Sequence, residues 1–303
     1  MTNAYVIGVD IGGTSIRIGA SDGSDELIHL QKIPSASIFT GADSVENLIG
    51  FLKDYIRELP EEKMVSAAAI GFPSTINKER DTVMQSPNLA GLDNIPLKTM
   101  LEEELGIKVL IEKDVNLLYC HDRKVLNLSR EGVHIGVYFG TGIGNAIFIN
   151  GKPLTGKDGA AGEIGHIPLV PGGKLCGCGN RGCAECYAGG KYLVELINTK
   201  YPGEPISELF VRHAESPEIQ EFVENAARVV ATEINLLNPE TIVLGGGVLN
   251  MKGFPTKLLE EQIRSCSRKP YPEESLEIYY SKDEVENGVR GAVEYARERI
   301  REC

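Results

Sequence analysis

The chain has 303 residues, which is the length of about two ordinary domains and enough to bury a hydrophobic core without disulfide support. Its 31 basic and 43 acidic residues give a net charge of −12, and no basic stripe is present to contact nucleic acid. No apolar run approaches the roughly 18 residues of a membrane-spanning helix, and the first residues lack the regions of a signal peptide. We therefore expect a cytoplasmic protein that binds neither nucleic acid nor a membrane.

Apolar segments that end in glycine alternate with amphipathic segments along the first half of the chain. Residues 4–9 and 15–20 read as two strands of a hairpin, joined by a turn that contains two glycines. A helical pattern over 44–59 and strands over 65–70 and 109–112 follow. This alternation predicts an α/β fold.

The second half repeats that order. Strands over 135–139 and 146–149 flank a glycine-rich turn, as in the first hairpin, so we interpret the two regions as an internal duplication. After them come a helix over 218–237, strands over 241–244 and 276–280, and a closing helix over 289–301. We expect two domains, 1–118 joined by the C-terminal helix 289–303, and 119–288.

Three glycine turns are candidates for phosphate binding, because exposed backbone N–H groups and small residues admit an anion closely. Each has a plain alternative as a tight hairpin or a strand-to-helix junction. The three turns together favour ATP, with the carboxylate of the first turn able to hold Mg²⁺ through water. Their residues are Asp10, Gly12, Gly13 and Thr14; Gly140, Thr141, Gly142 and Gly144; and Gly245, Gly246 and Gly247.

One histidine and three cysteines follow at a spacing that a tetrahedral metal ion can use. Imidazole and thiolate together favour zinc, and four protein ligands describe a structural ion rather than a catalytic one. The predicted ligands are His166, Cys176, Cys178 and Cys183, and the carboxylates Glu163 and Glu185 bracket them. The other cysteines are scattered, which suits a reducing compartment better than a disulfide framework: Cys120, Cys186, Cys266 and Cys303.

Taken together, the three glycine turns and the Gly-His and C-x-C-G-x-x-G-C-x-E segments resemble the ROK family of sugar kinases over nearly the whole chain. The resemblance implies an actin-like (ribonuclease H-like) two-domain kinase with duplicated α/β domains, a cleft between them and a zinc-binding loop in the larger one. It also implies ATP with Mg²⁺ as cofactors, a structural zinc ion and a hexose as partners. We further expect a homodimer.

The same resemblance assigns the reacting groups. The stretch Glu112-Lys113-Asp114-Val115-Asn116 matches the motif in which the family's aspartate is the general base, and this makes Asp114 the expected catalytic residue. Without the resemblance, an aspartate in this position would more often be a helix cap. The sugar-contacting residues that the family implies are Asn88, Lys113, Asp114, Glu163, His166 and Glu185.

Two positions depart from the family pattern. Lys113 stands where many members carry a sugar-binding asparagine, and Ser74 stands where a glycine is common near the sugar. A lysine donates hydrogen bonds but accepts none, so the preferred hydroxyl stereochemistry should change. We therefore expect an ATP-dependent kinase for the 6-hydroxyl of a hexose, with D-allose as first choice.

Alternative substrates are glucose, N-acetylmannosamine, N-acetylglucosamine or a β-glucoside. A non-catalytic sugar sensor or transcriptional regulator is a further alternative from a different class, because the family includes such proteins. Asp10 comes only nine residues after Met1, so we expect no DNA-binding module before it and do not favour the regulator.

Overall fold

The computed structural model describes residues 4–301, so Cys303 lies outside the described residues. The chain forms two compact units. The first contains residues up to Asn127, Thr155–Ala161 and residues from Glu284 onward, and the second contains Leu128–Leu154 and Gly162–Asp283. The sequence-based division after residue 118 falls inside helix α3 (Asp114–Val125), which the first unit contains whole. Within residues 4–301, no helix is both long and apolar enough to cross a membrane.

The first unit is built on a five-stranded sheet of order β3-β2-β1-β4-β7. Its first three strands form antiparallel pairs, while β1 pairs with β4 and β4 with β7 in parallel. The hairpin expected over 4–9 and 15–20 is confirmed. The strands are β1 (Ala4–Ile11), β2 (Ser15–Ser21), β3 (Ile28–Pro34), β4 (Met64–Phe72) and β7 (Lys108–Lys113), with the small hairpin β5 (Thr75–Ile76) and β6 (Val83–Gln85) beside them.

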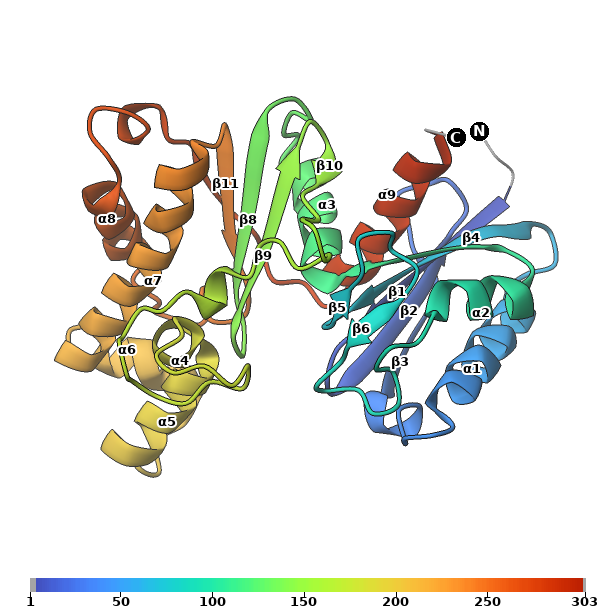
Figure 1. Cartoon of the computed structure of the whole chain (residues 1–303), viewed down its shortest axis with the longest axis horizontal. Coiled ribbons are helices and arrows are strands. Elements are labelled where there is room, and N and C mark those ends of the chain that lie inside the picture. Colours follow the sequence, from blue (N-terminus) through green and yellow to red (C-terminus); the bar gives the residue numbers. More distant parts are fainter. Residues whose placement is uncertain (1–3, 302–303) are drawn as a thin grey trace. The chain divides into compact units, whose positions relative to one another are not determined.

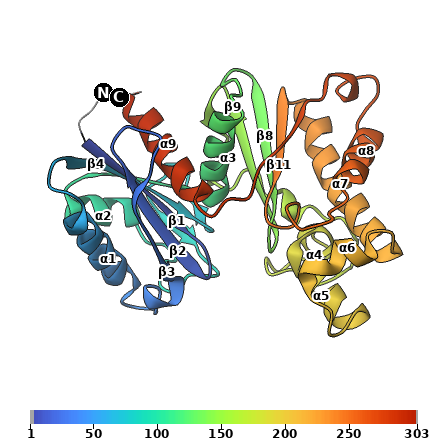
Figure 2. The same ribbon diagram turned by 180° about the vertical axis from the view of Figure 1, so that it is seen from behind.

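Helices cover both faces of this sheet. Helices α1 (Ser44–Glu58) and α2 (Leu97–Leu105) lie on one face, and α9 (Asn287–Arg301) crosses the other (Figures 1 and 2). Helix α1 buries Val45, Leu48 and Leu52, one side of its amphipathic pattern, in the core.

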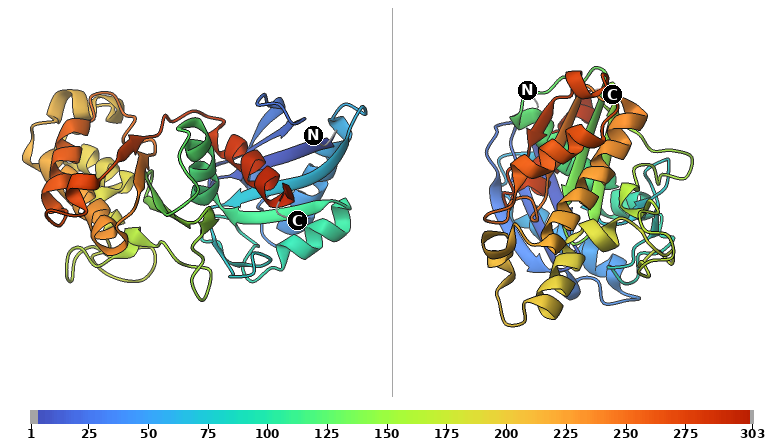
Figure 3. Two further views of the ribbon diagram at one scale, coloured as in Figure 1. Left: turned by 90° about the horizontal axis from the view of Figure 1, so that it is seen from above. Right: turned by 90° about the vertical axis from the view of Figure 1, so that its left-hand side faces the viewer.

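Helix α9 also packs along α3 (Figure 3). Gly291 makes this possible, because a Cβ atom there would lie 1.9 Å from the carbonyl oxygen of Leu117. The first unit therefore joins the far end of the chain to the helix that begins at Asp114.

The second unit repeats the sheet of the first. Its order is β10-β9-β8-β11-β12, again with two antiparallel pairs followed by two parallel pairs. This shared topology confirms the internal duplication. The strands are β8 (Val133–Phe139), β9 (Ile143–Ile149), β10 (Lys152–Pro153), β11 (Thr241–Gly245) and β12 (Ile278–Tyr280). Because β9 begins at Ile143, the second glycine turn is shorter than the sequence suggested.

The longest helix, α7, packs its apolar side into the core of the second unit. Ser216 caps its N-terminus by accepting a hydrogen bond from the N–H of Ile219 at 3.4 Å, and Pro217 occupies the first turn. Asn238 ends it in the left-handed conformation. The helices of this unit are α4 (Glu185–Ala188), α5 (Gly190–Lys200), α6 (Leu209–His213), α7 (Pro217–Leu237) and α8 (Thr256–Cys266).

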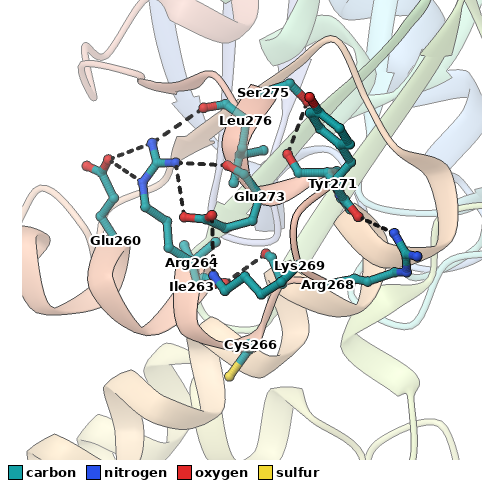
Figure 4. A network of polar contacts seen from close by, with 12 residues as sticks. Glu260, Ile263, Arg264, Cys266, Arg268, Lys269, Tyr271, Glu273, Ser275 and Leu276 are labelled. Carbon is teal, nitrogen blue, oxygen red and sulfur yellow. Dashed lines mark hydrogen bonds and ion pairs between the residues drawn. The ribbon is translucent and has the colours of Figure 1, made fainter.

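A network of polar contacts holds the loop between α8 and β12 (Figure 4). Arg264 donates to the carbonyl oxygens of Glu273 and Leu276 at 3.3 and 3.4 Å, and its guanidinium lies 3.2 Å from the Glu260 carboxylate. Lys269 in turn donates to the carbonyl oxygen of Arg264 at 2.6 Å. Arg264 thus satisfies two carbonyl groups of a loop whose regular structure is a single 3-10 turn, Glu273–Ser275.

Candidate active site

The first glycine turn joins β1 to β2 in the first unit. The Gly12 N–H donates to the carbonyl oxygen of Ser15 at 2.9 Å, which closes the turn and leaves Gly13 and Thr14 exposed. Asp10 stands at its start, with an Oδ2 atom 3.1 Å from Arg17 Nη1. Burial raises the pKa of Asp10, and the Arg17 charge opposes that shift. The turn therefore offers exposed backbone beside a carboxylate.

Asn88 lies against this turn. A Cβ atom on Gly13 would be 3.4 Å from the Cβ of Asn88, so the two residues are in contact distance. The structure thus gathers a sequence-predicted sugar residue and a sequence-predicted phosphate residue in the first unit.

Asp114 begins helix α3 directly after strand β7. Its Oδ1 accepts a hydrogen bond from the Val115 N–H at 2.8 Å, as an acid in a first helical turn does. A glycine is needed on the neighbouring strand, because a Cβ on Gly71 would lie 3.3 Å from the Cα of Asp114 and 2.8 Å from Leu117. Gly71 is paired in register with Glu112. The strand-to-helix junction thus fixes the backbone of the expected base.

The second and third glycine turns lie next to each other in the second unit. Strands β8 and β11 are parallel neighbours, and the Val248 N–H donates to the carbonyl oxygen of Phe139 at 3.0 Å. Gly246 sits so close to Phe139 that a Cβ would meet its backbone at 2.5 Å. These turns follow the carboxyl ends of parallel strands, where ligands bind in α/β sheets.

A mainly apolar cavity of about 400 Å³ opens beside these two turns. Sequence analysis missed most of its lining, because isolated apolar residues on a helix give no sign that they face a cavity. The Gly189-Gly190 pair was the available signal: the Gly190 N–H donates to the carbonyl oxygen of Gly140 at 2.8 Å. The lining residues are Gly140, Thr141, Gly190, Lys191, Leu193, Val194, Ile206, Gly247, Val248 and Met251.

The four expected metal ligands come together in the same unit. One donor atom from each of His166, Cys176, Cys178 and Cys183 lies within 4.8 Å of every other. The Sγ atoms of Cys178 and Cys183 are 3.6 Å apart, and Cys176 Sγ is 3.6 Å from His166 Nδ1. A tetrahedral zinc ion with bonds of about 2.3 Å spaces its ligands by about 3.8 Å, so the donor set fits zinc. A backbone hydrogen bond from Asn180 lowers the pKa of the Cys178 thiol, whereas burial raises the pKa of the Cys176 and Cys183 thiols.

Of the three expected sugar-binding residues of this unit, His166 belongs to the cluster, and Glu163 and Glu185 lie beside it. Glu185 Oε1 is 3.1 Å from Cys176 Sγ and 4.0 Å from His166 Nδ1. Glu163 Oε2 is 3.9 Å from the other ring nitrogen, Nε2. The two ring nitrogens of His166 thus face different groups: Nδ1 faces Cys176 and Glu185, and Nε2 faces Glu163.

Glu185 also reaches the second glycine turn. A Cβ on Gly142 would lie 2.3 Å from Glu185 Oε2, so any larger residue would displace this carboxylate from its position. The cysteine cluster, Glu185 and the second glycine turn therefore lie in contact with one another. The sequence gave no sign of this contact, because Gly142 and Glu185 are more than forty residues apart. Lys113 is buried in the first unit, where its Nζ donates to the carbonyl oxygen of Ala161 at 3.4 Å.

Comparison with known proteins gives a consistent result. A family model described as ROK family matches residues 6–299. The glucokinase of Thermotoga maritima is 29% identical over 99% of this chain and 99% of its own length. The N-acetyl-D-glucosamine kinase of Pectobacterium carotovorum is 29% identical over 83% of this chain and 88% of its own. A solved structure of a ROK family glucokinase from Streptomyces griseus, in complex with glucose and AMPPNP, has 26% identity and a TM-score of 0.78, covering 97% of this chain and 100% of that one.

The chain therefore belongs to the ROK family, and it is a sugar kinase. The expected two-sheet α/β fold of that family is confirmed.

Proposed function

We propose that the protein is an ATP-dependent hexose kinase that transfers the γ-phosphoryl group to a sugar hydroxyl, at C6. The observation that carries this proposal is the position of Glu185. Its carboxylate touches Cys176 of the ligand cluster and the Gly142 turn at once. An acid held in this way, beside backbone that can approach a phosphate, suits a sugar hydroxyl that must meet a phosphoryl group.

Asp114 is the proposed general base. Its carboxylate takes the proton of the attacking hydroxyl while the sugar oxygen bonds to the γ-phosphorus and the bond to the β,γ-bridging oxygen breaks, releasing ADP. Catalysis of this kind rests mainly on aiming the hydroxyl and stabilising phosphate charge, so the ordinary basicity of an aspartate suffices. Mg²⁺ would neutralise charge on the phosphates, and we propose that Asp10 would hold it through water.

ATP is proposed to bind along the glycine turns. The apolar walls of the 400 Å³ cavity suit an adenosine, and its polar edge is formed by Gly140, Thr141 and Gly247. Thr14 and Thr141 lie at the exposed tips of their turns, where a hydroxyl can donate to a phosphate oxygen.

His166, Cys176, Cys178 and Cys183 are proposed to hold a structural zinc ion. Four protein donors leave no open position for chemistry, so the ion would act by fixing the loop. Its effect on the sugar is indirect: the cluster orients Glu163 and Glu185 through the contacts on His166 and Cys176.

D-Allose is our first choice of sugar, because Lys113 replaces an amide with a donor-only group next to the base, and allose differs from glucose only at C3. Lys113 is buried in the first unit beside the carbonyl oxygen of Ala161, and we propose that its ammonium group contributes to sugar specificity. Glucose and N-acetylglucosamine are alternatives with as much support as allose, because the similar proteins are named as kinases for those two sugars.

Two measurements test this function. A coupled ADP-release assay over allose, glucose, mannose, N-acetylmannosamine, N-acetylglucosamine and β-glucosides should show a clear preference for one sugar, and equal rates on glucose and allose would remove the argument from Lys113. Asp114→Asn should fold and bind sugar while turnover falls by about a hundredfold or more. Near-normal turnover would remove Asp114 from the role of base.

A further inference from the structure

An arginine from a surface turn reaches the strand that precedes the proposed base. Arg80 lies in the tight turn between β5 and β6, yet its side chain is only 13% exposed. Its Nη2 lies 3.1 Å from Glu112 Oε1, and Glu112 is 1% exposed at the end of β7. Burial of a charged pair at this depth is costly unless other groups satisfy it.

Glu112 is well satisfied. Its carboxylate accepts hydrogen bonds from the Lys113 N–H at 2.8 Å, from Asn116 Nδ2 at 2.9 Å and from the Tyr295 hydroxyl at 3.1 Å. These partners come from β7, α3 and α9. These hydrogen bonds hold the Glu112 carboxylate in one position, two residues before Asp114.

The other terminal nitrogen of the Arg80 guanidinium, Nη1, contacts backbone carbonyl oxygens. Nη1 donates to the carbonyl oxygen of Ile76 at 2.9 Å and is 3.4 Å from the carbonyl oxygen of Gly159. Gly159 is pressed against the same turn, because a Cβ there would lie 1.9 Å from the Ile76 oxygen. Segment Thr155–Ala161 therefore rests on the Arg80 turn and, through Ala161, on Lys113.

The backbone conformation of the turn between β5 and β6 holds the Arg80 side chain in this inward position. Arg80 has a φ of +57°, a conformation that a residue with a long side chain adopts only at a cost. Asn77 braces the turn by accepting from the N–H groups of Asp81 and Thr82 at 3.0 and 3.1 Å. The strain is explained if the turn serves to aim the arginine inward.

We propose that Arg80 is a positioning residue for the sugar: its guanidinium fastens segment Thr155–Ala161 to Glu112, and so fixes where the chain leading to Glu163 departs from the first unit. The inference rests on the proposed function, since it takes Glu163 as a sugar-binding residue. In this proposal Arg80 contacts neither substrate. It acts through the segment, so its loss should weaken hexose binding and leave the nucleotide alone.

The experiment compares Arg80→Ala with a double variant, Arg80→Met with Glu112→Gln, which leaves no unpaired buried charge and so protects the fold. Arg80→Lys keeps the charge but loses the forked donors, and Arg57→Ala is the matched control, because Arg57 is 73% exposed on α1. The rate of amide hydrogen exchange in the peptide spanning 155–161 measures how firmly Arg80 holds this segment, a contact that we call the tether. The KM values for hexose and for ATP measure the effect of the tether on substrate binding.

In Arg80→Ala and the double variant, we expect exchange in 155–161 about tenfold faster, and a hexose KM raised about tenfold with the ATP KM within about twofold. Arg80→Lys should fall between these variants and the wild type, and Arg57→Ala should match the wild type. Unchanged exchange in the double variant overturns the tether, whatever the kinetics. Faster exchange with an unchanged hexose KM overturns the positioning role. A wild-type enzyme that phosphorylates no hexose would instead refute the proposed function, and the exchange measurement would still decide the tether.

Discussion

Gly142→Ala tests the contact between the second glycine turn and Glu185. The added methyl carbon would lie 2.3 Å from Glu185 Oε2, whereas ordinary contacts begin near 3.4 Å. The carboxylate must therefore move by about 1 Å, and side-chain rotation can supply this movement, because Oε2 is the far end of a flexible side chain. The substitution thus displaces one carboxylate and removes none of the four proposed metal ligands.

The expected magnitude follows from the hydrogen bond that Glu185 is proposed to make. A hydrogen bond from a neutral hydroxyl to a carboxylate contributes about 1.5–3 kcal/mol, which corresponds to about a 10- to 150-fold change in binding. The KM for the hexose should rise by an amount in this range. Stability should change little, because replacing glycine also restricts the unfolded chain, by about 0.4–1 kcal/mol in favour of folding.

Steady-state kinetics on the preferred sugar, thermal unfolding and zinc content together decide the outcome. Gly177→Ala is the matched control, since a Cβ at that glycine meets nothing within 4 Å. The reasoning is refuted if Gly142→Ala keeps its metal and fold and still shows the wild-type hexose KM. It is also refuted if Gly177→Ala shows the same rise.

The remaining predictions concern the metal and the pH dependence of stability. The purified protein should contain one zinc per chain by atomic emission, and Cys178→Ser should lose it and raise the hexose KM; a metal-free wild type with full activity contradicts this. Burial raises the pKa of Glu233 to about 7 from an ordinary value of 4.5, while its hydrogen bond with Asn145 opposes the shift. Because the folded state holds this proton more tightly, the stabilisation is fully present below pH 4.5 and is lost as the pH rises through 7, a difference of about 3 kcal/mol. Glu233→Gln should therefore gain stability over the wild type by about that amount between pH 4.5 and pH 8 in urea titrations, and a constant difference would refute the assignment.

Local patterns in the sequence were sufficient for the main elements of both sheets. The apolar runs that became β1, β4, β8 and β11 are buried on both faces, so they appear in the sequence as continuous hydrophobic segments. The repeated strand, turn, strand order also gave the duplication. The strand β3 was missed because it is an edge strand that alternates exposed and half-buried residues, and short edge strands carry a weak signal.

The ligand cluster could be recognised from spacing because its four members lie within eighteen residues of one another, and zinc chemistry restricts which residue types can serve. The three glycine turns could be named in the same way. The sequence also supplied Asp114, through its match to the family motif; in the structure Lys113 is the cap residue, and Asp114 accepts a hydrogen bond from the Val115 N–H in the first helical turn.

Only the tertiary structure could place these parts against one another. The contact of Glu185 with Gly142, the cavity beside Gly190 and the reach of Arg80 to Glu112 and Gly159 each join residues that are more than thirty positions apart. Such contacts depend on which strands pair across long sequence separations and how closely their backbones approach, and local residue patterns predict pairing only between the neighbouring strands of a hairpin. The sequence determined which chemical groups this kinase has available for its site. The folded structure decided which of these groups are in contact, because burial and hydrogen bonding act between neighbours in space.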